Sequence, residues 1–114
     1  MTPVCFERQY TSSIDWEAAQ PIVCPICGSN YNHLIRIAVN QGGRLALVDG
    51  DGLRVVDSLK VGRGSSVWVE YWCEGCGQLW HERRQFHKGQ VFQAVLPSER
   101  PEAEDALAHA LWRD

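Results

Sequence analysis

Four of the five cysteines in this 114-residue chain belong to two copies of one short pattern. The pattern is Cys-x-x-Cys-Gly, at residues 24–28 and again at residues 73–77. Each copy predicts a tight turn that aims both sulfurs at one point, and its glycine lets backbone amides turn towards the thiolates. Two such turns supply four soft ligands, which suit zinc or a single iron in tetrahedral geometry. We therefore predict one metal site with the ligands Cys24, Cys27, Cys73 and Cys76.

The two patterns resemble the knuckles of the zinc-ribbon superfamily. The resemblance covers both motifs and the strands beside them, and it implies that one structural Zn2+ closes the two knuckles. Four thiolates leave no open coordination position for activating water, so we expect a binding module and not an enzyme. The same knuckles are similar to those of rubredoxin, an iron electron carrier, with Tyr31 and Trp80 as nearby aromatics. Between Cys27 and Cys73 lie 45 residues, far more than the roughly 15 to 20 that separate the knuckles of a compact ribbon. This long insertion argues against rubredoxin and therefore favours the zinc interpretation.

Cysteine usage predicts the compartment. The number of cysteines is odd, the chain starts without an apolar signal segment, and no run is long enough to span a bilayer. We therefore expect a cytoplasmic, reducing setting with no membrane contact, where such pairs are more often metal ligands than disulfides. Cys5 is left over and is predicted to be a buried thiol, with a redox or dimer contact as the alternative.

The net charge of −3 is concentrated at the C-terminal end. Residues 1–98 carry nine acidic and nine basic side chains, whereas residues 99–114 carry five acidic and two basic ones. A neutral body argues against strong sequence-independent binding to DNA, which needs a net basic face to release counterions. A local basic patch remains compatible with this balance.

The only concentrated basic segment is residues 81–88. We therefore predict a nucleic-acid-associated or regulatory binding protein that uses the hairpin of residues 79–92. Together with nearby aromatics, this basic segment would form a mixed surface that stacks bases and pairs with phosphates of single-stranded nucleic acid. The predicted binding residues are Arg83, Arg84, His87, Lys88, Trp68, Trp72, Trp80 and Phe86. One alternative is a solvated edge strand with the aromatics in the core. Another is a protein-interaction adaptor that docks on a larger partner through a sheet edge or the C-terminal helix. No small-molecule substrate is evident.

An enzyme hypothesis depends on four residues without another role, which are Asp49, Asp51, His81 and His87. The two aspartates lie in an Asp-Gly-Asp-Gly sequence that is similar to a calcium loop but lacks the later oxygen ligands. The two histidines are expected about 20 Å apart along one extended strand, too far for joint chelation. His33 follows an asparagine, as in His-Asn-His nucleases, but that pattern needs a helix where we expect a hairpin.

The elements that must position these residues are mostly strands. Period-two alternation broken by Gly, Asn and Asp predicts strands at residues 31–39, 44–48, 53–56, 67–72, 78–86 and 91–96. Residues 31–72 form inserted hairpins between the knuckles, and residues 78–96 form a C-terminal hairpin. Before the first knuckle, Ser12 and Asp15 predict a helical turn that places Trp16 on the metal-site layer.

Two regions are expected. Residues 1–98 are predicted to form a zinc-ribbon β domain whose first strand lies within residues 1–10. Residues 99–114 are predicted to form a helix from about residue 102 to 112, packed on the domain or on a partner, because its alanines and leucines recur at spacings of three and four. The predicted fold is mostly β: a zinc ribbon with an inserted antiparallel β-meander and a short C-terminal α-helix.

Overall fold

A computed structural model describes residues 11–58, 64–98 and 103–112. Six strands in these ranges form one antiparallel sheet, and the one helix that is described has six residues. The strands are β1 (Asn32–Gln41), β2 (Arg44–Asp49), β3 (Gly52–Asp57), β4 (Ser66–Cys73), β5 (Leu79–His87) and β6 (Gln90–Pro97), and the helix is α2 (Ala103–Ala108). The mostly β class and the six predicted strands are confirmed. The predicted strand within residues 1–10 and Cys5 lie outside the described residues.

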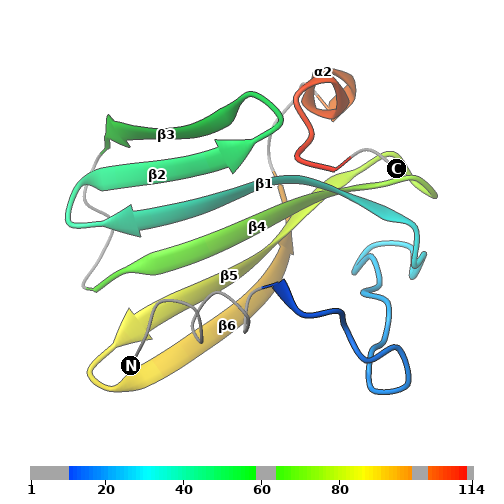
Figure 1. The fold of residues 1–114 in the computed structure, drawn as a ribbon, viewed down its shortest axis with the longest axis horizontal. Coiled ribbons are helices and arrows are strands. Elements are labelled where there is room, and N and C mark those ends of the chain that lie inside the picture. Colours follow the sequence, from blue (N-terminus) through cyan, green and yellow to red (C-terminus); the bar gives the residue numbers. More distant parts are fainter. Residues whose placement is uncertain (1–10, 59–63, 99–102, 113–114) are drawn as a thin grey trace.

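The strand order is β3-β2-β1-β4-β5-β6, so β1 and β4 are the central strands (Figure 1). The chain makes two three-stranded meanders, and the antiparallel β1–β4 ladder joins them. The first knuckle precedes β1 and the second follows β4. Because Asn32 at the start of β1 pairs with Cys73 at the end of β4, this ladder brings the two knuckles to the same end of the sheet.

Two tight turns set the register of the outer hairpins. Gly42 and Gly43 connect β1 to β2 with φ of 59° and 88°. Lys88 and Gly89 connect β5 to β6 with φ of 49° and 78°, and their flanking residues pair directly. Two-residue turns with positive φ match the twist of the flanking strands, which explains the regular ladders on either side.

The C-terminal segment pairs with the part of β1 that extends beyond β2. Leu111 N donates to Ile35 O at 2.9 Å, and Trp112 N donates to Leu34 O at 3.0 Å. These bonds use a stretch of β1 where the β4 register shifts and β2 no longer pairs. The prediction of a helix over residues 102–112 is therefore wrong at its C-terminal end, because the chain leaves the helix to bridge to the sheet.

Two small clusters make up the core of the described residues. The first contains Ile35, Leu79, Ala106 and Ala110, with Trp72 and Leu107 packed against it. The second contains Cys24, Cys73 and Trp80, with Tyr71 and Cys76 beside it. The small side chains of α2 and the residues after it thus pack on the sheet. Among the described residues, no helix has the length and apolar character needed to cross a bilayer.

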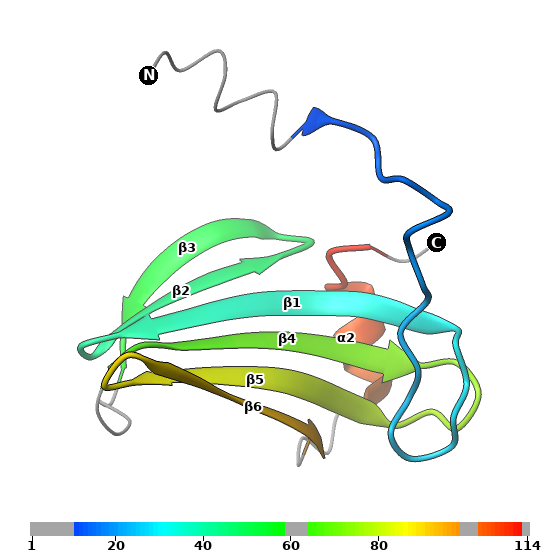
Figure 2. The same cartoon turned by 90° about the horizontal axis from the view of Figure 1, so that it is seen from below.

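No strand or helix occurs between residues 12 and 31, a range that includes the first knuckle. Asp15 organises a turn in which its carbonyl accepts from Ala18 N at 3.1 Å and its carboxylate accepts from Glu17 N at 3.0 Å. Trp16 is 81% exposed, so its predicted packing on the metal-site layer is wrong. Trp80 and Tyr71 already cover the cysteines, and Figure 2 shows residues 11–20 extending away from the sheet.

Candidate metal centre

The two knuckles have the same backbone hydrogen bonds. In the first, Cys24 N donates to Ser29 O at 2.8 Å, and Gly28 N donates to Cys24 O at 2.9 Å. In the second, Cys73 N donates to the carbonyl of residue 78 at 2.9 Å, and the glycine amide donates to Cys73 O at 2.8 Å. Both glycines have positive φ, 80° and 72°. A side chain disfavours this conformation, which explains why each Cys-x-x-Cys is followed by glycine.

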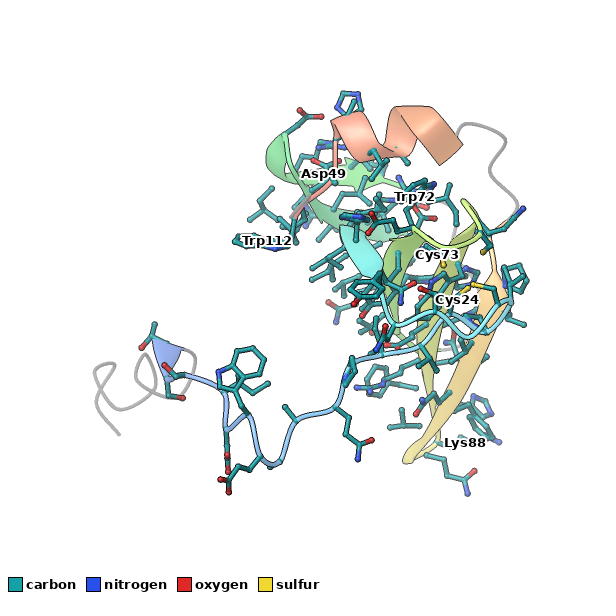
Figure 3. All side chains as sticks on the ribbon, turned by 90° about the vertical axis from the view of Figure 1, so that its right-hand side faces the viewer. Cys24, Asp49, Trp72, Cys73, Lys88 and Trp112 are labelled. Atoms are coloured by element: carbon teal, nitrogen blue, oxygen red, sulfur yellow. The ribbon has the colours of Figure 1, made fainter. Side chains whose placement is uncertain are left out.

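The four predicted ligands converge on one point. Cys24 Sγ lies 3.8 Å from Cys76 Sγ, Cys27 Sγ lies 3.5 Å from Cys73 Sγ, and all four sulfurs lie within 4.8 Å of one another. A tetrahedral site with metal–sulfur distances of about 2.3 Å has sulfur–sulfur edges of about 3.8 Å. The sulfur cluster therefore fits one tetrahedral metal ion, and Figure 3 shows Cys24 and Cys73 together at the end of β4.

Of the four cysteines, Cys73 ionises to a thiolate most easily. Burial opposes ionisation of Cys73, but hydrogen bonds from the Cys76 and Gly75 amides and from neighbouring thiols lower the pKa of Cys73 to about 7. Burial and the neighbouring thiols raise the pKa of Cys76 to about 12. Four sulfurs at this spacing repel as thiolates, and a bound divalent cation would remove that repulsion.

Trp80 supports the centre from inside the sheet. It is 1% exposed and stacks on Tyr71 with ring centroids 4.6 Å apart. Its Nε1 donates to Asn32 Oδ1 at 2.9 Å, and Asn32 Nδ2 donates to Ser29 O at 3.1 Å in the first knuckle. Trp80 was predicted to contact a partner, but the structure places it in the core because the metal-site layer needs a large apolar cover.

The knuckles also contact each other directly. Glu74 N, in the second knuckle, donates to Tyr31 O, just after the first, at 3.0 Å. A Cβ atom on Gly75 would lie 2.9 Å from Ser29 Cβ, so this close approach requires glycine. His33 lies beside Glu74, with Nε2 3.5 Å from Oε2. The segment after this knuckle is β5, not the helix that the nuclease comparison needs.

Strand alternation divides the other predicted binding residues between two faces. We call the face with Ala38, Trp68 and His81 the pocket face. The register puts Trp68, Trp72, Arg83 and His87 on the pocket face, and it puts Trp80, Arg84 and Phe86 on the opposite face. Lys88 lies in the β5–β6 turn, and Trp72 packs against the cluster below α2. The eight residues therefore do not form one surface.

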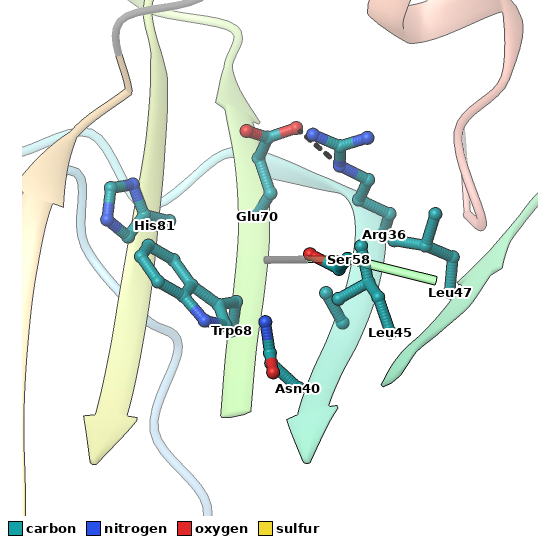
Figure 4. Close-up of a pocket in the computed structure, with 9 residues that line it drawn as sticks. Arg36, Asn40, Leu45, Leu47, Ser58, Trp68, Glu70 and His81 are labelled. Atoms are coloured by element: carbon teal, nitrogen blue, oxygen red, sulfur yellow. Dashed lines mark ion pairs between the residues drawn. The ribbon is translucent and has the colours of Figure 1, made fainter. Parts of the chain in front are cut away.

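The pocket face carries a hollow of about 240 Å³ (Figure 4). Its lining consists of Arg36, Ala38, Asn40, Leu45, Leu47, Ser58, Trp68, Glu70 and His81. The buried Glu70 carboxylate lies 3.3 Å from Arg36 Nε. The hollow thus combines an apolar wall with an ion pair and a buried amide, the mixture that is typical of ligand sites.

Trp68 is the centre of an aromatic and basic group on this face. The Arg83 guanidinium lies 4.4 Å from the centroid of the Trp68 ring, and the His81 ring lies 5.1 Å away. Burial lowers the pKa of His81 although Glu70 opposes this, so a neutral imidazole faces the hollow at pH 7. His81 Nδ1 lies 2.8 Å from Ser98 Oγ, which fixes the ring.

Sequence patterns did not identify Arg36, Asn40 and Glu70 as parts of this hollow. Arg36 and Glu70 are 34 positions apart and become cross-strand partners only in the β1–β4 register. One signal for this pair was present in the sequence. Each central strand carries a charged residue in its middle, on a face that alternation predicts to be half-buried, and such residues often pair across strands. The register itself was not predictable from alternation alone.

The four residues of the enzyme hypothesis do not form one cluster. Asp49 accepts two bonds from Arg54, at 3.0 and 2.8 Å, and Asp51 Oδ2 lies 2.7 Å from His109 Nδ1. His81 and His87 lie on β5, and β1 and β4 separate that strand from the β2–β3 turn. Each aspartate already has a structural partner.

Comparisons with protein-family models, with curated proteins and with solved structures found no match to this chain.

Proposed function

We propose that the chain is a zinc ribbon in which one Zn2+ has a structural role and the enlarged sheet is a binding surface. The two equivalent knuckles and the spacing of their sulfurs support this proposal. Because four thiolates complete a tetrahedral coordination sphere, the module is not an enzyme at the metal. Metal analysis with an absorption spectrum tests the assignment: one colourless zinc per chain supports it, and a red iron chromophore would move the function to electron transfer.

The surface that we assign to binding is the pocket face around Trp68, and the ligand is single-stranded nucleic acid. The observation that carries this proposal is the Arg83 guanidinium over the ring of Trp68, a residue that lines the hollow. Aromatic side chains stack on bases of any sequence, and nearby arginines pair with phosphates. Bases in a duplex are already stacked, which favours single strands.

The hollow has room for one base. A cavity of about 150 Å³ holds benzene, so a hollow of about 240 Å³ has space for a larger flat ring. Asn40, His81 and the Arg36–Glu70 pair border this space, so the edge of a bound base would meet polar side chains there. The neutral body makes few phosphate contacts available, so we expect a shallow salt dependence.

Adjacent arginines on opposite faces provide a matched test. We would titrate the zinc-loaded protein into fluorescein-labelled single strands of about 15 nucleotides and into the corresponding duplex, and read anisotropy at low salt. Arg83→Ala should weaken single-strand binding about tenfold, because it removes the group over Trp68. Arg84→Ala removes the same charge from the other face and should change affinity by less than about twofold.

Two outcomes would contradict the nucleic-acid proposal. Equal losses for both arginine variants would mean that only overall charge matters. Absence of binding by the unmodified protein, with zinc loaded and the sheet folded, would end the proposal outright.

A protein adaptor is the second candidate. Ala106 and Ala110 are buried against the sheet, so α2 is not free to dock on a partner with this face. The other adaptor hypothesis is docking through a sheet edge, in which a strand of a larger partner protein adds to the sheet. The uncharged outer edge of β6 favours this hypothesis.

A further inference from the structure

The outer edge of β6 has no strand partner among the described residues. Its sequence, QVFQAVLP, contains no charged residue. Four large apolar side chains are between 39% and 56% exposed, two on each face of the sheet: Val91, Phe92, Val95 and Leu96. An exposed apolar edge of eight residues is unusual in a monomer, because it offers a template for another strand.

The hairpin turn determines which backbone groups of β6 point outward. His87 and Gln90 flank the two-residue turn, and such a closing pair exchanges both of its hydrogen bonds. Because bonded and non-bonded pairs alternate, the N–H and C=O groups of Val91, Gln93 and Val95 point away from β5. These three residues present six backbone groups at the free edge.

β6 lacks the devices that protect other edges. Its register with β5 has no bulge, and its proline comes only at the last position. By contrast, β3 at the other side of the sheet is a shorter strand that carries Arg54 and Asp57. The exposed part of β1 is covered by Leu111 and Trp112. Among the described residues, the edge at β3 and the exposed part of β1 are therefore protected against pairing with another strand, whereas the edge at β6 is not.

We propose that the occupant of this edge is β6 of a second copy of the chain, paired antiparallel about a two-fold axis at Gln93. In this register Val91 lies opposite Val95 of the second copy, and Gln93 lies opposite itself, so all three outward residues form bonded pairs. A two-fold axis places identical residues around one point, which would bring like charges together in a charged strand. β6 has no such charge, so it is complementary to itself.

Side chains also match across this interface. On one face the valines at 91 and 95 of the two copies adjoin, and β-branched cross-strand pairs stabilise sheets. On the pocket face Phe92 lies opposite Ala94 of the second copy, a large residue against a small one. Pairing would extend each sheet into one continuous sheet of two copies. This inference is independent of the nucleic-acid proposal.

The test uses opposite charges at Gln93, an exposed position. The unmodified zinc-loaded protein should sediment as a dimer at micromolar concentration in analytical ultracentrifugation. Gln93→Lys and Gln93→Glu, measured separately, should each raise the dimer dissociation constant about tenfold or more, because identical charges then face each other. An equimolar mixture of the two variants should recover the dimer. Circular dichroism and zinc content show that each variant is folded.

A matched control lies on the other edge of the sheet. Val55→Lys introduces the same charge at an exposed residue of β3 and should leave the dimer intact. A monomeric unmodified protein over the whole concentration range would overturn the proposal. So would a dimer that Gln93→Lys leaves unchanged, or a mixture that remains monomeric.

Discussion

The side chain of Asn32 connects the cysteine cluster to the sheet. Its side-chain oxygen accepts from Trp80 Nε1, and its side-chain nitrogen donates to Ser29 O and, at 3.3 Å, to Ile22 O. One side chain at the start of β1 therefore joins the buried cover of the cysteines to the backbone on both sides of the first knuckle. Groups that orient ligands in this way affect both stability and metal affinity.

We predict that Asn32→Ala destabilises the zinc-loaded protein by about 1–3 kcal/mol, because it leaves the buried Trp80 N–H without an acceptor. Urea unfolding followed by tryptophan fluorescence measures this change. Asn30→Ala alters an exposed asparagine in the same loop and should have an effect below about 0.5 kcal/mol. Equal effects of the two substitutions would show that Asn32 has no supporting role.

At the scale of elements, the β2–β3 turn and the segment after α2 hold each other. Gly50 N donates to His109 O at 2.9 Å, and a Cβ atom on Gly50 would lie 2.5 Å from Ala110 O. Asp51 pairs with His109 at the same place. The hairpin thereby fixes the position of the C-terminal segment, whose next residues complete the edge of β1.

Asp49 stabilises this turn in a pH-dependent way. Hydrogen bonds from Arg54 lower the pKa of Asp49 below its usual value, so its folded carboxylate contributes stability above its unfolded pKa of about 3.9. That contribution is lost as pH falls through the lower folded-state pKa. We predict that Asp49→Asn costs about 1–2 kcal/mol at pH 7, and that this cost decreases as pH falls through the lowered folded-state pKa, when the variant is compared with the unmodified protein at the same pH.

Thermal unfolding at a series of pH values measures this difference. Asp57→Asn changes an exposed carboxylate at the end of β3 and should cost less than about 0.5 kcal/mol at pH 7. A cost for Asp49→Asn that stays the same as pH falls, in protein that still holds its metal, would contradict the assigned role of the ion pair.

Much of the element structure was predictable from the chain, whereas the contacts between elements were not. Alternation over residues 67–72 and the glycines at 42 and 43 depend only on neighbours, and these strands and turns are present. The exposed position of Trp16 was not predictable, because the place expected for it is filled by Trp80, a residue 64 positions later. The end of α2 depends on free backbone groups of β1, which alternation does not reveal.

The same distinction holds for the metal site and the hollow. The Cys-x-x-Cys-Gly pattern determines its own turn from neighbouring residues, so the convergence of the four sulfurs was predictable. Arg83 and Arg84 were predictable only as residues on opposite faces; which one lies over Trp68 follows from the β4–β5 register. Register depends on long-range pairing, which one sequence does not specify.

For the whole molecule, the described core is too small to account for a stable fold by itself. Its two clusters contain seven buried side chains, and two of those are the ligands Cys24 and Cys73. A sheet with one short helix leaves much of its apolar surface in water, and small domains of this kind depend on metals or disulfides. In the proposed zinc ribbon, the metal would supply stability that the packing of the described residues does not.

We predict that chelation unfolds the sheet cooperatively. Structural zinc contributes on the order of 10 kcal/mol, comparable to the whole stability of a small domain. Near-ultraviolet circular dichroism should be lost when a strong chelator removes the metal, and one equivalent of Zn2+ should restore it. A metal-free chain that keeps its spectrum and its unfolding midpoint would contradict this role.

The distance between the two knuckles also has a consequence for synthesis on the ribosome. Cys24 and Cys27 leave the exit tunnel long before Cys73 and Cys76, and until then the nascent chain offers only half of the ligands. β1 can pair with β2, and β2 with β3, during that interval, but the other side of β1 waits for β4, the strand that ends at Cys73. In the proposed zinc ribbon, ion capture and the pairing of β1 with β4 would therefore be one late event, which must wait until Cys73 and Cys76 have been translated.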